Sequence, residues 1–350
     1  MDKLLNMLIL DQKNAADIYK PGPYWLKKST AAIKELERCG LTDFRSSNDN
    51  NTAAASFSDN TPVDGRRLLD LSSLQNKIGL AILEHTPLKL LFDWQVNCTR
   101  KYLNLFLDLE KKYLPLFKID RLTELTKKYK IENSINFGCD RLLFFKGKQY
   151  SIHYLNLLEQ LDFIETNSSL KGCRSFLEIG PGFGANIHVI EQNYSEIRKF
   201  IAIDIVPNVW VVTNYLRSLY GDCVKDYLTT KDMKEIKFKE DTSLEIYVIP
   251  PWEIEKISSS IDCFWNAHSF VEMPKHIISN YAKNLARIRT NKTIYNFISY
   301  NKFDLKTTFH PDLILDHFLD VEFQKLRHPV FSDENRNSYF YLGKLKSKSQ

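Results

Sequence analysis

The chain has 350 residues, of which 43% are hydrophobic and 13% aromatic, so it can fill a substantial core and is not mainly disordered. Its 48 basic residues against 43 acidic ones give a formal net charge of only +5. Three Lys-Lys pairs, beginning at residues 27, 111 and 127, lie far apart with acidic residues near them. Nucleic-acid binding, which usually needs a concentrated basic stripe, is therefore not expected.

The cysteines and the first residues bear on location. Six cysteines lie tens of residues apart without a Cys-x-x-Cys pair, which indicates free thiols in a reducing compartment. The apolar run from Leu4 to Leu10 is bracketed by Asp2 and Asp11 and is too short to cross a bilayer. We expect a cytoplasmic protein without a membrane span. The oligomeric state is open.

The first 149 residues predict a mainly helical N-terminal domain. Tyr24 to Cys39 has helical spacing, and Gly40 is suited to end the helix. Residues 46–64 are small and polar, which predicts a surface loop or a linker. Apolar-periodic segments follow from about 68 to 116, and a second helical run covers 119–130.

After residue 149 strands and helices alternate, which predicts a second domain, 150–350, with a parallel, Rossmann-like sheet and helices on both faces. Helices are expected at 151–166, 186–192 and 209–220. The last three strand candidates are closely spaced and fit a sheet that ends in an antiparallel pair. The strand candidates are 175–179, 199–205, 244–250, 261–267, 293–299, 320–326 and 337–345.

A glycine-rich turn follows the first of these strands. Glu178, Gly180, Gly182 and Gly184 form an E-x-G-x-G-x-G run, and Asp204 ends the next strand. Glycines allow a ligand to approach the backbone, a helix from about residue 185 offers free N–H groups, and an acid after the second strand can bind a ribose diol. The pattern fits dinucleotides and S-adenosylmethionine. The mid-chain position and the acid before the first glycine, placed to meet a methionine amino group, favour S-adenosyl-L-methionine as the cofactor.

Three segments resemble the bacterial sugar O-methyltransferase family. They are LEIGPGFGANIHVI (177–190), AIDIVPNVWVVTNYLRSLYG (202–221) and DCFWNAHSFVEMPKHIISNY (262–281), with mild departures at Pro181, Phe183 and Val206. PGPYW (21–25) and YSIHYLNLLEQL (150–161) fit the family's general layout. The resemblance covers roughly 150–300 well and implies the class I methyltransferase fold and transfer of a methyl group from S-adenosylmethionine to a sugar hydroxyl.

The segment after the strand IDCFWN is the best source of a general base for a hydroxyl nucleophile. His268 is the first candidate, because imidazole titrates near neutral pH. Glu272 is the second, as the base or as an orienting group. If a helix begins near Ser269, Glu272 is instead a capping-box partner. Asn266 and Ser269 are candidates to bind substrate hydroxyls or to cap the turn.

Other residues have a functional and a packing interpretation. Tyr154 is a candidate substrate contact, although it and Tyr215 also fit a packed core. Trp252 fits adenine stacking or core packing. An acidic and histidine-rich stretch near residues 310–317 contains His310, Asp312, Asp316 and His317. Their spacing matches no established metal site. The favourable interaction of a carboxylate with a helix dipole explains Asp312. No metal is expected.

The sequence thus predicts an S-adenosylmethionine-dependent O-methyltransferase that acts on a sugar hydroxyl, in a nucleotide sugar or a surface-glycan precursor. One alternative is a methyltransferase of another small molecule, with an oxygen or nitrogen acceptor. The other is a cofactor-binding module without catalysis.

Overall fold

The computed structural model of the protein describes residues 2–41, 119–132, 137–138, 143–145, 148–300, 311–328 and 338–347. The predicted polar linker at 46–64 and the apolar segments between 68 and 116 lie outside these described residues.

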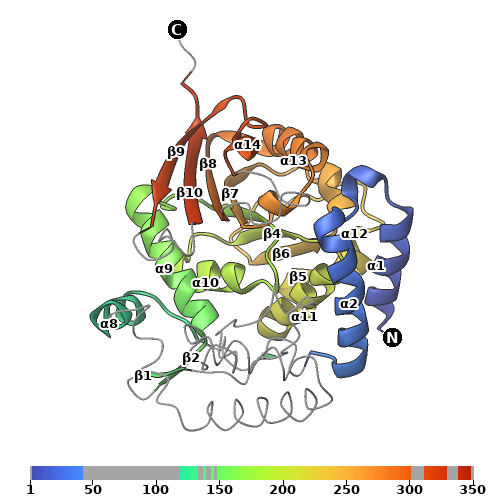
Figure 1. The fold of residues 1–350 in the computed structure, drawn as a ribbon, viewed down its shortest axis with the longest axis horizontal. Helices are drawn as coiled ribbons and strands as arrows, with labels where there is room; N and C mark the ends of the chain where they lie inside the picture. Colours follow the sequence, from blue (N-terminus) through green and yellow to red (C-terminus); the bar gives the residue numbers. More distant parts are fainter. Residues whose placement is uncertain are drawn as a thin grey trace, which may run out of the picture.

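An eight-stranded sheet forms the centre of the molecule (Figure 1). Its strand order is β5-β6-β4-β3-β7-β8-β10-β9. Neighbours from β5 to β8 are parallel, and β10 is antiparallel to both β8 and β9, so the predicted antiparallel end is confirmed. The strands are β3 Ser175–Ile179, β4 Lys199–Ile203, β5 Val224–Lys225, β6 Glu245–Ile249, β7 Ile261–Ala267, β8 Arg289–Tyr300, β9 Val321–Arg327 and β10 Ser338–Leu345.

The central strands are buried along their whole length because both faces of the sheet are covered. All five residues of β3, β4 and β6 are buried. Alternate side chains enter two cores. Phe176 and Phe200 pack with the helices of one face, whereas Leu177 and Ile201 pack with those of the other. The predicted fold class, a Rossmann-like sheet with helices on both faces, is confirmed.

Two sets of helices make these cores. On one face lie α9, α10 and α11, and on the other lie η3, α13 and α14 (Figure 1). The bounds are α9 Ile152–Asn167, α10 Ala185–Asn193, α11 Asn208–Tyr220, α12 Tyr227–Thr230, α13 Lys275–Ile288 and α14 Asp312–Leu315, with short 3₁₀ turns η2 Gly221–Cys223, η3 Pro251–Lys256 and η4 Phe270–Glu272. The helices expected at 151–166, 186–192 and 209–220 are therefore present.

The first helices lie beside the sheet's first edge and not apart from it. They are α1 Lys3–Asn14, η1 Asp17–Tyr19 and α2 Pro23–Cys39, and Figure 1 shows α1 and α2 next to α12. Asp2 accepts a hydrogen bond from Trp210 Nε1 at 3.1 Å, and Tyr227 donates to Asp11 at 2.8 Å. Gly40 ends α2 with a positive φ of 62°, as the sequence predicts.

A helix and a hairpin precede α9. They are α8 Ile119–Lys128 and the antiparallel pair β1 Leu143–Phe145 and β2 Lys148–Tyr150. Arg121 of α8 donates to Glu159 at 2.8 Å and to Asp162 at 2.6 Å, both on α9. These charged hydrogen bonds attach α8 to α9.

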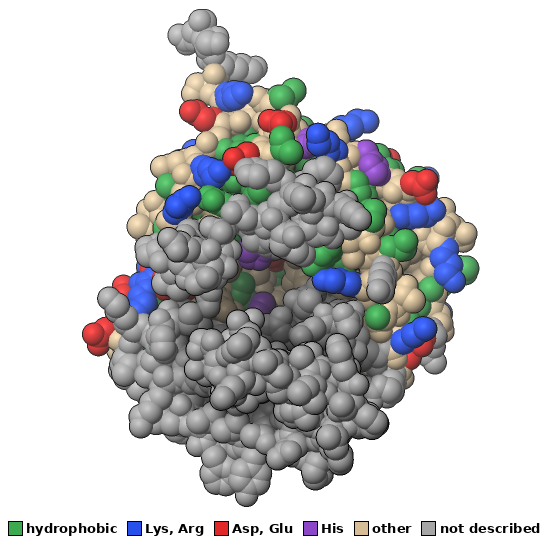
Figure 2. Space-filling view, viewed as in Figure 1, with side chains coloured by type: hydrophobic (Ala, Val, Ile, Leu, Met, Phe, Trp, Pro, Cys, Tyr) green, Lys and Arg blue, Asp and Glu red, His purple; other side chains and the backbone are tan. Residues whose placement is uncertain are grey.

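The described surface is mixed in charge. Basic and acidic side chains are interspersed over the coloured part of Figure 2. Within the residues that the structure covers, no helix has both the length and the apolarity that a membrane span requires.

Candidate active site

The glycine turn lies where the sequence places it, between β3 and α10. Gly180, Gly182 and Gly184 have φ values of 73°, 64° and 94°, which residues with a side chain rarely adopt. Helix α10 begins at Ala185, so its free N–H groups border the turn. In register, Ile179 pairs with Ile203 of β4, so the turn and the end of β4 lie side by side.

Gly180 also permits a close approach by the segment after β7. A Cβ at this position would lie 2.4 Å from Ser269 Oγ, which is well inside van der Waals contact. Ser269 in turn donates to the carbonyl of Ile179 at 3.2 Å. The absence of a side chain at Gly180 therefore lets the ends of β3 and β7 meet.

Glu178 is buried at the end of β3, with 2% of its surface exposed. Its Oε1 accepts a hydrogen bond from Asn186 Nδ2 at 3.2 Å. Its Oε2 has no hydrogen-bond partner among the described residues. Burial, with a contribution from the nearby Asp204 charge, raises the pKa of Glu178 to about 8. A cationic donor placed at Oε2 would relieve both the missing bond and the desolvation cost.

Asp204 follows β4 and faces the glycine turn. Its carboxylate accepts from the backbone N–H of Gly182 at 3.2 Å and of Ile205 at 2.8 Å. Burial raises the pKa of Asp204 to about 7, opposed by these hydrogen bonds and one from Asn208, and reinforced by the charge of Glu272. Two carboxyl groups with raised pKa values therefore flank the turn.

A cavity of about 540 Å³ opens at the carboxyl ends of the strands, where ligands bind in open α/β sheets. This volume falls in the range typical of small-molecule sites. Its wall combines the glycine turn, the ends of β4 and β7, one side of α9 and a segment near the N-terminus. The described residues that line it include Tyr19, Lys20, Pro21, Gly22, Tyr24, Trp25, His153, Asn156, Gln160, Glu178, Gly180, Gly182, Asp204, Asn208, His268, Ser269, Glu272 and Tyr281.

The segment after β7 forms a bonded turn. Asn266 is 1% exposed. Its Nδ2 donates to the Ile179 carbonyl at 2.8 Å and to Ser269 Oγ. Its Oδ1 accepts a hydrogen bond from the backbone N–H of Phe270. Asn266 thus holds the turn, which is one of its two predicted roles, and Ser269 reaches the cavity wall. Glu272 ends the short turn η4, which has no capping bond from Ser269, so the capping-box interpretation is wrong.

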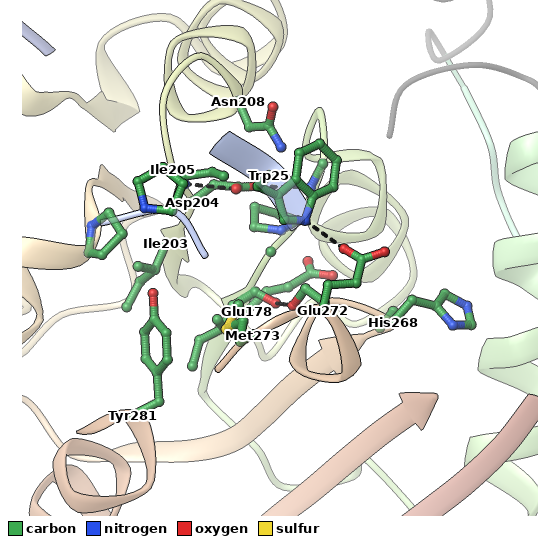
Figure 3. A pocket seen from close by; sticks show the side chains of 18 of the residues that line it. Trp25, Glu178, Ile203, Asp204, Ile205, Asn208, His268, Glu272, Met273 and Tyr281 are labelled. Atoms are coloured by element: carbon green, nitrogen blue, oxygen red, sulfur yellow. Dashed lines mark hydrogen bonds between the residues drawn. The ribbon is translucent and has the colours of Figure 1, made fainter. Parts of the chain in front are cut away.

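His268 lies on the cavity wall with an unusual positive φ of 68°. Its backbone N–H bonds to the Ile298 carbonyl at 2.7 Å. Burial lowers the pKa of His268 to about 4, so the imidazole is neutral at neutral pH. In Figure 3 its ring points away from the Trp25–Glu272 pair, so the two candidate bases do not form one catalytic pair.

Two aromatic candidates are in packed surroundings. Tyr154 is 1% exposed, is hydrogen-bonded to Tyr215, and is not among the described residues that line the cavity. Trp252 donates from Nε1 to Tyr227 at 3.2 Å and packs edge-on against its ring. The structure therefore places both in the packing role that the sequence also allowed.

The acidic and histidine-rich stretch near residues 310–317 makes contacts other than metal coordination. Asp312 pairs with Lys325 at 2.8 Å and accepts from Tyr341 at 2.7 Å, while His310 lies outside the described residues. Over the described ranges, no three His, Cys, Asp or Glu residues are grouped so that they could hold a metal ion.

Two parts of the wall were not identified from the sequence as site residues. One is the face of α9 with His153, Asn156 and Gln160, whose helical spacing of three and four residues puts them on one side. The other is the segment from Tyr19 to Trp25. The sequence of α9 does not indicate which of its sides meets the cavity, because polar residues such as Glu159 and Asp162 lie at other positions of the helix. No local signal marks the second part.

No family model matches the sequence, and no curated protein matches it. Solved structures that resemble the chain include the mitomycin 7-O-methyltransferase MmcR, with 10% identity and a TM-score of 0.39, and the pyocyanin biosynthetic protein PhzM, with 11% and 0.39. Each match covers 56% of this chain and 56% of that protein, so it spans only just over half of either. A S-adenosylmethionine-dependent methyltransferase from Clostridium acetobutylicum matches with 11% identity and a TM-score of 0.38, over 54% of this chain and 92% of its own. The likeness concerns the fold, and identities and TM-scores this low transfer neither activity nor substrate.

Proposed function

We propose that this chain is an S-adenosylmethionine-dependent O-methyltransferase whose acceptor is a sugar hydroxyl. The observation that carries the proposal is the pair of buried carboxyl groups, Glu178 and Asp204, on either side of a turn with three positive-φ glycines. Glu178 Oε2, which has no partner among the described residues, suits the cofactor's ammonium group. Asp204, which already accepts from Gly182, suits the ribose hydroxyls.

The charge of the cavity supports this cofactor. Glu178, Asp204 and Glu272 all line it, and the pKa values of Glu178 and Asp204 are raised by burial and by a neighbouring carboxylate. S-adenosylmethionine carries two positive groups, an ammonium and a sulfonium, which would offset this charge. When bound, it would supply an electrophilic methyl group.

The polar side of α9 supports a hydroxyl-rich acceptor. His153, Asn156 and Gln160 line the cavity from this helix. Asn156 Oδ1 is buried without a hydrogen-bond partner within the described part of the chain. Hydroxyl donors of a sugar would satisfy such an acceptor, which is costly to leave unpaired.

His268 is the proposed base. Since its pKa is about 4, it accepts a proton as a neutral imidazole and is too weak to ionise a hydroxyl in advance. It would instead take the proton as the oxygen becomes acidic during bond formation. Glu272 is less suited to this role, because its Oε2 already accepts a hydrogen bond from Trp25 Nε1 at 2.6 Å.

Isothermal titration tests the cofactor. We expect the wild type to bind S-adenosylmethionine, and Asp204→Ala to bind it roughly 10- to 100-fold more weakly, as befits lost hydrogen bonds to a charged group. No binding by the wild type would end the methyltransferase proposal, and tight NAD binding would point to an oxidoreductase.

Turnover tests the base and the acceptor. Release of S-adenosylhomocysteine is followed with a panel of nucleotide sugars and deoxysugars. His268→Ala should lower turnover by roughly 10²–10⁴ with cofactor affinity within a few-fold, as expected of a general base. His276→Ala removes an exposed histidine of α13 and is the matched control. Equal rates for both variants on an accepted sugar would exclude His268, and activity only on other alcohols or amines would exclude the sugar.

A further inference from the structure

Residues 19–25, here called the strap, form one wall of the cavity although they precede every other described wall segment by more than a hundred positions. Tyr19, Lys20, Gly22, Tyr24 and Trp25 are among the residues that line it. Their position is set by the end of η1 and the start of α2. The described cavity is therefore completed by a segment outside the sheet and its crossover helices.

The strap is docked by close contacts. A Cβ at Gly22 would lie 2.5 Å from Cδ of Pro274, so only a glycine lets the strap approach this closely. Tyr19 donates to Glu255 Oε1 at 2.7 Å. Because both contacts are made to segments that follow strands of the sheet, the strap is held over the carboxyl ends of those strands.

The strap's last residue, Trp25, shares the cavity wall with three carboxylates, Glu178, Asp204 and Glu272. Trp25 Nε1 donates to Glu272 Oε2 at 2.6 Å, a bond between residues 247 positions apart. In Figure 3 the indole lies between Asp204 and Glu272, with Glu178 below it. Hydrogen bonds to a carboxylate are short and strong, so this bond fixes where the ring lies.

We propose that Trp25 is a cofactor-contact residue that recognises the positive charge of the sulfonium, and that Glu272 is the residue that positions it. The inference rests on the proposed function. In S-adenosylmethionine the sulfonium joins the ribose and the amino-acid parts, which Asp204 and Glu178 are proposed to hold. The indole lines the same cavity as those two carboxylates and is bonded to Glu272, whose charge acts on Asp204, so it neighbours the proposed place of the cationic centre. Tryptophan attracts cations most strongly of the aromatic side chains.

The charge gives a selective test, because S-adenosylhomocysteine is a neutral thioether at the same position. Isothermal titration compares both ligands on the wild type and Trp25→Leu. We expect the substitution to weaken S-adenosylmethionine binding by roughly 5- to 20-fold, as for loss of a desolvated cation–π contact, and S-adenosylhomocysteine binding by less than about twofold. Equal losses for the two ligands would reduce Trp25 to a steric wall and overturn the proposal.

Trp252→Leu is the matched control, since it removes an indole with a similar N–H bond, to Tyr227, outside the described wall. It should leave the ratio of the two affinities unchanged. If the wild type binds neither ligand, the proposed function itself is refuted. If the wild type binds both ligands and Trp25→Leu has the same ratio of affinities as the wild type, only this inference is refuted.

The positioning role of Glu272 has its own readouts. Glu272→Gln keeps an acceptor for the indole N–H and should retain most of the selectivity, whereas Glu272→Ala should lose it as Trp25→Leu does. The emission of Trp25, isolated as the difference between wild type and Trp25→Phe, should change when S-adenosylmethionine is added. A difference spectrum that the ligand leaves unaltered, or Glu272→Ala with wild-type selectivity, would contradict the assignment.

Discussion

Replacing Glu178 by glutamine should change how the stability of the cofactor-free protein depends on pH. Burial raises the pKa of this carboxyl from 4.5 to about 8 in the folded chain. Between these two pH values the folded state holds a proton that the unfolded state has lost. The free energy of unfolding therefore falls as pH rises, by about 1.4 kcal/mol per pH unit for one group. Over the whole window the loss is at most about 5 kcal/mol.

Urea denaturation from about pH 5 to about pH 9 measures this loss in the wild type and in Glu178→Gln. Glutamine resembles the protonated carboxyl in shape and cannot ionise. The two proteins should be similar near pH 5, and the wild type should become progressively less stable relative to the variant until about pH 8. Subtracting the two curves removes the titration of groups that both proteins share.

Glu240→Gln is the control, because it removes the same formal charge at an exposed position. Its difference from the wild type should stay within about 0.5 kcal/mol throughout. Parallel pH profiles for wild type and Glu178→Gln would refute the idea that this carboxyl is protonated when buried. The same reasoning predicts that S-adenosylmethionine binds more tightly as pH rises from about 6 to about 7, because a cationic ligand requires Glu178 and Asp204 to lose their protons while its own α-amino group stays charged in this range.

Two further substitutions test local geometry. Gly180→Ala should lower the free energy of unfolding by roughly 2–4 kcal/mol, because the position has a positive φ and the added Cβ would clash with Ser269. The control Gly172→Ala should cost only about 1 kcal/mol, since that position has a φ of 86° and nothing within 4 Å of the added Cβ. Equal losses in thermal or urea unfolding would rule out the clash. Arg121→Met should cost roughly 1–3 kcal/mol, since it removes charged hydrogen bonds from two largely buried carboxylates of α9, which keep only Lys128, Tyr129 and His328 as their described partners. Lys325→Met, which breaks a half-exposed pair, should cost less than about 1 kcal/mol. A reversed order in urea midpoints would contradict the attachment of α8 through these bonds.

The glycine turn and Asp204 could be predicted because their signal is local. An apolar strand, three glycines at alternate positions and an acid after the next strand lie within thirty residues of sequence. Parallel pairing of β3 and β4, with Ile179 opposite Ile203, then brings the two ends together. Every step follows from a periodicity or a turn preference that a single segment displays.

The face of α9 could not be predicted in the same way. The helix is apolar on most sides, so its sequence does not indicate which side meets the cavity. Tyr154 and His153 are neighbours in sequence, but a helix turns by about 100° per residue, so their side chains point in different directions. His153 lines the cavity, whereas Tyr154 is buried in the core. Only the packing of α9 against α10 and the sheet decides this.

The Trp25–Glu272 bond shows the other limit. Each residue has an unremarkable neighbourhood, and Glu272 matched the spacing of a capping box with Ser269. The structure gives Glu272 a tertiary partner in place of the local one, because the tight approach of Gly22 to Pro274 brings α2 within reach. A contact that spans 247 positions leaves no trace in sequence periodicity.

The docking of α1 has a consequence for synthesis on the ribosome. Leu4, Leu5 and Leu8 are buried in the finished molecule, and Asp2 bonds to a residue 208 positions later in the chain. At about 5–20 residues per second, Trp210 is made roughly 10–40 s after Asp2. During that interval α1 lacks its contacts with α11 and α12, so its docked position is reached only after about 200 further residues have been added.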